Sequence, residues 1–133
     1  MLNLKALANM SNCFCGNSDS YIDYCEPKIN RVQNAKSAEA LMRSRYSAYC
    51  IHNADYLVET THRSTRKFHQ KTDILQWSTS NQWLKLEIIF AMETTVEFKA
   101  YYLDGSLKAT VHHEKSTFVF ENGSWFYVDG IFF

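Results

Sequence analysis

The spacing of apolar residues in this chain changes at Asn81. Before that point, residues 37–61 place apolar side chains three and four positions apart, which is typical of amphipathic helices. After it, apolar and polar residues alternate over 83–102, as they do in half-buried strands. Asp104-Gly105 and Asn122-Gly123 are dipeptides that favour tight hairpin turns. We therefore expect an α+β chain in which helices precede a four-stranded antiparallel meander and cover one face of a curved sheet.

The helical half carries its own start signals. Ser37 is the expected N-cap of a helix that runs to about Cys50, and Asn53 is the expected N-cap of a second, short helix. Residues 64–80 are predicted to form a third, irregular helix, for which Asp73 is a candidate cap. All three helices would lie on the chain before the first strand.

The two turn dipeptides also predict a strand register over about 82–130. A two-residue turn at the first of them places Glu97 opposite His112, and a two-residue turn at the second places Ser116 opposite Asp129. A bulge in either hairpin would change these faces. Without one, a single face of the sheet carries Glu97, Lys99, Tyr101, His112, Glu114, Ser116, Phe118, Trp125, Tyr127 and Asp129.

A cysteine motif near the start of the chain is the strongest chemical signal. Cys13 and Cys15 lie at C-x-C spacing, Gly16 allows the backbone to turn, and Cys25 follows after a short loop. Three such thiols can converge on one tetrahedral zinc, but a structural site uses four nitrogen or sulfur ligands. The fourth ligand can be Glu26, a histidine or water, or the site can be weak or empty of metal.

Charge and hydropathy exclude several partner classes. Lys plus Arg and Asp plus Glu both number 14, so the formal net charge is zero. Nucleic acids and anionic membranes are bound through a basic excess, and we expect neither as a partner. No apolar run approaches the roughly 20 residues of a membrane span. Residues 1–7 are too short and too mixed for a signal peptide, which predicts a cytoplasmic protein with reduced cysteines.

Several segments carry a family resemblance. The stretch CFCGNSDSYIDYC resembles a SEC-C motif, a zinc-binding knuckle. The stretches AEALMRSRYSAYCIHNADYLVETTH, WLKLEI and HEKSTFVFENGSWFYVDG, in this order, resemble the YchJ family of small bacterial proteins. The resemblance implies a SEC-C-like knuckle and tail over 1–30. It also implies a cone domain of the nuclear-transport-factor or ketosteroid-isomerase type, with a cystatin-like arrangement, over 31–133. It implies no particular reaction.

The chain departs from the family pattern in two places. The SEC-C motif usually ends in two adjacent ligands, and here Tyr24 stands where the first of them is expected, so that only Cys25 remains. Many relatives also carry a second knuckle at the C-terminus, and none follows before Phe133. Because a phenol near neutral pH is a poor zinc ligand, we expect low or absent metal affinity.

Polar residues at the predicted crossing of the first long helix and the sheet are candidates for a ligand pocket. Arg43 and Arg45 can clamp an anionic ligand or pair with carboxylates such as Asp55 or Asp129. His62 follows a helix end and can act as a cap or as a base in the pocket. The full set of candidate pocket residues is Arg43, Arg45, Tyr46, His62, Trp125 and Asp129.

Three functions follow from these features. The first is a non-catalytic binding or adaptor protein whose knuckle contacts a protein partner and whose cone binds a small ligand. The second is a small-molecule enzyme that uses His, Asp or Glu groups for acid–base chemistry, and the third is a zinc-dependent module. A cavity lined by a carboxylate and a histidine would favour the enzyme. The apolar segment 130–133 is a candidate contact for a homodimer through the open sheet face.

Overall fold

The computed structural model describes residues 12–133. Residues 1–11, which belong to the expected knuckle and tail and include the segment considered as a signal peptide, lie outside the described part. Along the chain the elements are α2 (Cys25–Ile29), α3 (Ala38–Cys50), α4 (Ala54–Glu59), the 3-10 helix η1 (Arg66–Phe68), α5 (Lys71–Ser80), β1 (Gln82–Ala91), β2 (Thr95–Leu103), β3 (Ala109–Glu121) and β4 (Ser124–Phe132). Within residues 12–133 no helix is both long enough and apolar enough to cross a membrane.

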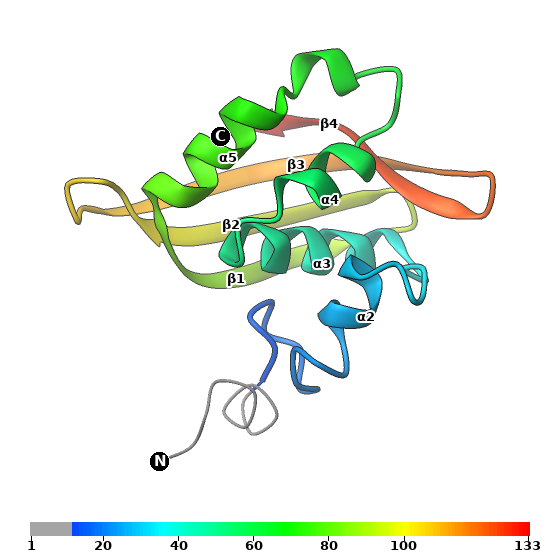
Figure 1. The fold of residues 1–133 in the computed structure, drawn as a ribbon, viewed down its shortest axis with the longest axis horizontal. Coiled ribbons are helices and arrows are strands. Elements are labelled where there is room, and N and C mark those ends of the chain that lie inside the picture. Colours follow the sequence, from blue (N-terminus) through cyan, green and yellow to red (C-terminus); the bar gives the residue numbers. More distant parts are fainter. Residues whose placement is uncertain (1–11) are drawn as a thin grey trace.

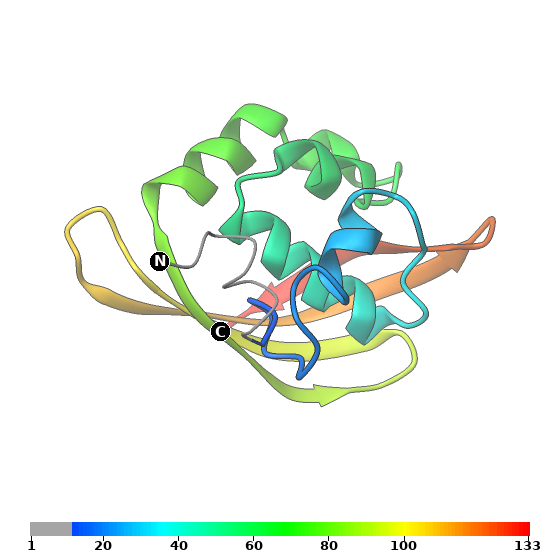
Figure 2. The same cartoon turned by 60° about the horizontal axis from the view of Figure 1, so that its bottom comes forward.

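The four strands form one antiparallel sheet in sequence order, as the alternation predicted. The sheet is curved, and α3, α4 and α5 lie on its concave side (Figures 1 and 2). α3 packs directly on β1, β2 and β4, while α2 packs on α3. The predicted α+β class, with helices on one face of a curved antiparallel sheet, is confirmed.

The helix starts follow the capping signals. The Ser37 hydroxyl accepts the Ala40 N–H at 3.0 Å, and the Asn53 side chain accepts the Tyr56 N–H at 3.0 Å. Asp73 does not cap the third helix as expected: it lies in the first turn of α5, and Gln70 occupies the N-cap without a side-chain hydrogen bond. An acidic residue in the first turn still complements the helix dipole.

The connection between β2 and β3 differs from the predicted two-residue turn. Leu103 pairs with Ala109, so residues 104–108 form a five-residue loop, in which the Asp104 carboxylate accepts the Ser106 and Lys108 N–H groups. This odd change in loop length reverses the expected faces of β2, and Ala100, not Glu97, lies opposite His112. The inner face of β2 therefore carries the apolar residues Val96, Phe98 and Ala100.

The connection between β3 and β4 is the predicted two-residue turn, with positive φ at both Asn122 and Gly123. Beyond it, the register shifts between Thr117 and Phe118, because β4 contains one additional residue there. Gly130, not Asp129, consequently lies opposite Ser116. Asp129 is exposed on the outer face, where the sequence had placed it on the inner one.

One hydrophobic core joins the helices, the sheet and the cysteine segment. α3 contributes Leu41, Met42 and Tyr46, and the cluster extends to Phe98 and Phe118 on the strands. Burying each large apolar side chain contributes about 1.5–3 kcal/mol. The three N-terminal cysteines belong to the same cluster, so the knuckle packs on the cone.

Candidate functional site

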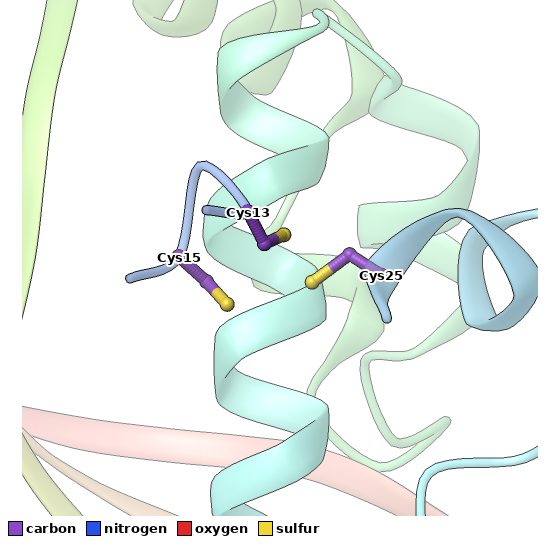
Figure 3. A group of neighbouring side chains, drawn as sticks. All are labelled: Cys13, Cys15 and Cys25. Carbon is purple, nitrogen blue, oxygen red and sulfur yellow. The ribbon is translucent and has the colours of Figure 1, made fainter. Parts of the chain in front are cut away.

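Two groups of functional side chains lie on opposite sides of α3. The first group is the cysteine cluster, which packs beside α3 (Figure 3), with the turn at Gly16 close to the backbone of β1. The second lines a cavity between α3, α5 and the inner face of the sheet.

The sulfur atoms of Cys13, Cys15 and Cys25 point toward one another beside α3 (Figure 3). All three residues are buried, and their sulfur atoms lie within 4.8 Å of one another. Gly16, at φ +90°, provides the turn that follows the C-x-C pair. The Cys13 sulfur also lies 3.5 Å from the Ser47 hydroxyl of α3. These three thiols fit three positions of a tetrahedral zinc site.

The thiols of the cluster titrate together. Hydrogen bonds from Cys15 and Cys25 lower the pKa of Cys13, whereas the hydrogen bond with Cys13 raises the pKa values of Cys15 and of Cys25. The neighbouring thiols thus favour the thiolate form of Cys13, which is the form that binds a metal. Metal binding by all three sulfurs requires that Cys15 and Cys25 also lose their protons.

The fourth ligand position is the weak point of this site. Within residues 12–133, the three sulfurs are the only potential metal-ligand atoms in this group. The Glu26 carboxylate is not part of it. Burial raises the pKa of Tyr24 to about 12, so its phenol stays protonated at neutral pH. The Tyr24 ring instead packs under the Lys28 ammonium, 3.5 Å from the ring centroid. Tyr24 is therefore a packing residue here.

Arg43 connects the knuckle to α3. Its Nη1 donates to the Cys15 carbonyl at 2.7 Å, and its Nε donates to Glu39 at 2.9 Å. This side chain therefore points to the cysteine cluster and does not line the cavity, although the sequence placed it among the pocket candidates.

The cavity in the cone has a volume of about 280 Å³. Most of its wall is aromatic, and Met42 and Ala100 complete the apolar part. The aromatic wall residues come from α3, α5 and three strands: Tyr46, Tyr49, Trp77, Trp83, Phe98, Tyr127 and Phe132. Trp77 packs edge-on against Trp83 at 4.9 Å and against His112 at 5.4 Å between ring centroids. A rigid aromatic wall of this kind favours flat, apolar ligands.

A buried carboxylate lies on the strand side of the cavity. Glu114 accepts hydrogen bonds from Ser116 and the Tyr127 hydroxyl at 2.7 Å and from His112 Nε2 at 2.8 Å. Burial acts to raise the pKa of Glu114, but these three donors outweigh it and leave the pKa below its ordinary value. Gly130 makes room for this arrangement, because a Cβ there would lie 2.6 Å from the Glu114 Cδ.

A buried guanidinium lies on the helix side of the same cavity. Arg45 is only 5% exposed, and its Nη1 donates to the Leu57 carbonyl and the Thr60 hydroxyl at 2.9 and 2.7 Å. The guanidinium also stacks over the Tyr127 ring, 4.5 Å from the centroid. No carboxylate of residues 12–133 lies within ion-pair distance of it. The alternative that Arg45 pairs with Asp55 or Asp129 is not found; Asp55 pairs with Lys71.

His69 completes the polar part of the lining. It follows η1 and packs edge-on against Tyr127, with 5.7 Å between ring centroids. Burial, and then the charge of Arg45, lower the pKa of His69, which is consequently neutral near pH 7.

The structure places the six candidate pocket residues in different surroundings. Arg45 and Tyr46 line the cavity, whereas Arg43 lies at the knuckle. His62 bonds to Glu121 and Ser64 near the second hairpin, and Trp125 packs against Phe120. Asp129 is exposed, as described above.

The most informative cavity residues were not among the six pocket candidates of the sequence analysis. Glu114, His112, Ser116 and Tyr127 were grouped on one sheet face by their alternation, and this grouping holds in the structure. The signal was therefore present, but the sequence offered Glu97 and Asp129 as carboxylates of the same face and did not distinguish Glu114 from them.

Comparisons with known proteins agree with this architecture. The family model described as the middle NTF2-like domain of YchJ matches residues 37–130. A UPF0225 protein of Photorhabdus laumondii is 39% identical over 126 residues, which cover 90% of this chain and 79% of the relative. A UPF0225 protein of Vibrio parahaemolyticus is 40% identical over 128 residues, which cover 92% of this chain and 75% of the relative.

Two solved structures have the same fold. A SEC-C motif containing protein from Rhodopseudomonas palustris superposes with a TM-score of 0.83 and 36% identity, over 90% of this chain and 97% of that one. A SEC-C motif containing protein from Psychrobacter arcticus gives a TM-score of 0.75 and 25% identity, over 92% of this chain and 83% of that one. The chain therefore belongs to the YchJ-like family, with its NTF2-like domain preceded by a SEC-C-like cysteine cluster.

Proposed function

We propose that this protein is a non-catalytic binding protein that holds a small molecule in the cavity of its cone. The observation that carries the proposal is the buried Arg45 guanidinium, which has no carboxylate partner in the described chain and borders an aromatic cavity of about 280 Å³. Maintaining a buried charge and open space costs stability, and a ligand that fills the cavity offsets that cost.

The state of Glu114 supports binding over acid–base catalysis. A general base works best when its pKa lies near the working pH, whereas the pKa of Glu114 is lowered and both of its oxygen atoms already accept hydrogen bonds. The carboxylate is thus a fixed charge that holds Tyr127 and His112 in place.

The enzyme alternative depends on His69. This residue lines the cavity as a neutral imidazole, so it can accept a proton from a bound molecule. Under that alternative, a bound ligand would be converted over hours, and His69→Gln would stop the conversion while leaving binding intact. Under the binding proposal, mass spectrometry recovers the ligand unchanged.

The cavity can be closed by substitution to test the proposal. Ala100 is buried on the cavity wall, and Ala109 is exposed on the neighbouring strand. We expect Ala100→Leu to fill the cavity and abolish thermal-shift responses to a small-molecule library, and Ala109→Leu to keep the wild-type responses. Equal responses in the two variants would place binding elsewhere.

The knuckle is the proposed contact for a protein partner. Phe14 lies between the two cysteines of the C-x-C pair, and its ring is half exposed and packs on Tyr21. A rigid exposed aromatic ring is a common anchor in protein interfaces. Cross-linking in cells tests this part: Phe14→Ser should lose a specific adduct that the control Val32→Ser, at an exposed site outside the knuckle, retains.

Zinc, where it binds, would be held by Cys13, Cys15 and Cys25 and would link the knuckle loop to α2. Its proposed role is structural, because the cluster is buried and none of its three cysteines lines the cavity.

A further inference from the structure

The hydrogen-bonding capacity left open in the cavity is mainly donor capacity. Nη1 of Arg45 makes all of the guanidinium's hydrogen bonds within residues 12–133, to Leu57, Thr60 and Thr61. Within residues 12–133 no fully buried side-chain nitrogen lacks a partner, so Nε and Nη2, which have none, keep some accessible surface. Because Arg45 lines the cavity, we take these two groups to face it. Two N–H groups on one edge of a planar guanidinium match the two oxygen atoms of a carboxylate.

The acceptor capacity of the buried carboxylate is already in use. Glu114 receives Ser116 and Tyr127 at one carboxylate oxygen and His112 at the other. A cationic ligand would have to displace these donors, whereas an anion at Arg45 displaces none. The two buried charges are also held apart by Tyr127, whose ring lies under Arg45 and whose hydroxyl bonds to Glu114.

The rest of the cavity limits the size and shape of the uncharged part of the ligand. A volume of about 280 Å³ lies just below the range of about 300–1,000 Å³ that is typical of ligand pockets, so a small ligand is expected. The wall also contains the Trp77–Trp83 pair, and Phe98 and Phe132 pack on His112. One or two fused aromatic rings would fit this space, but a long chain or a sugar would not use it.

From these three observations we propose that the ligand is a small aromatic monocarboxylate whose carboxylate forms a bidentate ion pair with Nε and Nη2 of Arg45. This inference rests on the proposed binding function and specifies its ligand class.

The test uses matched probes on the full chain: 2-naphthoate, the neutral 2-naphthalenemethanol and the cationic 2-naphthylmethylammonium. Binding is measured by tryptophan fluorescence and by calorimetry. We expect the carboxylate to bind at least about tenfold more tightly than the alcohol, because charge-assisted hydrogen bonds are about twice as strong as neutral ones. The ammonium probe should not bind.

Substitutions test whether Arg45 causes the preference for the carboxylate probe. Arg45→Met should remove the preference for the carboxylate, and Arg45→Lys should retain part of it, because a single ammonium keeps the charge and loses the bidentate geometry. Glu114→Gln should strengthen carboxylate binding by removing a nearby negative charge. Arg63→Met, at an exposed site, is the control and should behave as wild type. If Arg45→Met does not fold, Arg45→Lys and Glu114→Gln still decide the question.

The outcomes separate the two claims. Equal binding of the alcohol and the carboxylate, both lost in Ala100→Leu, would overturn the ligand class and leave the binding function standing. Tightest binding of the ammonium probe, lost in Glu114→Gln, would overturn the ligand class in the opposite direction. No binding of any probe, together with a silent library screen, would overturn both.

Discussion

Arg43 and Arg45 are two residues apart on one helix, and they serve different sites. Successive residues of an α-helix are rotated by about 100°, so two positions separate side chains by about 200°. Arg43 consequently reaches the Cys15 carbonyl, and Arg45 reaches the cavity. The sequence placed both in one pocket, although this rotation alone separates them. Helix phase is therefore the missing step in the sequence-based assignment.

The missing thiolate at position 24 can be restored. We expect wild-type protein to bind zinc weakly and Tyr24→Cys to bind it tightly, because the other three sulfurs are already within 4.8 Å of one another. Complete zinc-finger sites contribute about 10–16 kcal/mol of apparent binding free energy. Competition with a chromophoric chelator measures the change. Tyr21→Cys, which adds a thiol away from the motif spacing, is the control, and zinc retained by wild type after dialysis against a strong chelator would contradict the prediction.

Glu114 gives the folded state a dependence on pH. Its pKa is lowered in the folded protein from an ordinary value of 4.5, so its contribution to stability is fully present above that value. The contribution is lost as the pH falls through the folded-state pKa, because protonation removes the charge to which His112, Ser116 and Tyr127 donate.

Urea unfolding between pH 3 and 7 measures this dependence. Glu114→Gln should flatten the acid limb of the curve, whereas Glu93→Gln, at an exposed position, should not. An unchanged acid limb in Glu114→Gln would show that other carboxylates cause the loss of stability at low pH.

At the scale of elements, alternation and capping predicted most of the fold. The change of period at Asn81 located the start of the sheet, and Ser37 and Asn53 located two helix starts. One error of register arose in the connection between β2 and β3, and the other arose within β4. Asp104-Gly105 is a strong hairpin signal, yet the Asp104 side chain bonds to two backbone N–H groups and stabilises a longer loop. The additional residue in β4 left no clear signal in the alternation.

The position of Gly130 in β4 offers a test of that register. Because Gly130 lies opposite Ser116 on the inner face, Gly130→Ala should push the Glu114 carboxylate away from its donors and destabilise the protein by about 1–3 kcal/mol. Gly105→Ala is the matched control, since its Cβ would lie 3.9 Å from the nearest atom. Denaturant unfolding compares the two, and equal stability would contradict the assigned register.

At the scale of the molecule, no helix of residues 12–133 covers the convex face of the sheet (Figure 2). Exposed apolar residues on it include Val111, Ile131 and Phe133, and Phe133 packs on His113 with 4.4 Å between ring centroids. Contiguous apolar surface of this kind is commonly buried in an interface. We expect a homodimer through this face, which light scattering would detect. Val111→Glu should give a monomer and Val32→Glu, remote from the sheet, should not; a monomeric wild type at high concentration would contradict the expectation.

The proposed binding function and the proposed ligand class both require that the cavity is a ligand site. The most direct measurement is a ¹H–¹⁵N NMR spectrum of the wild-type chain recorded with a library of small aromatic acids and their neutral analogues. The predicted result is that a subset of compounds shifts the side-chain N–H signals of Trp77, Trp83 and Arg45, which line the cavity, and that Ala100→Leu abolishes these shifts. The contradicting result is a spectrum in which no compound moves those signals.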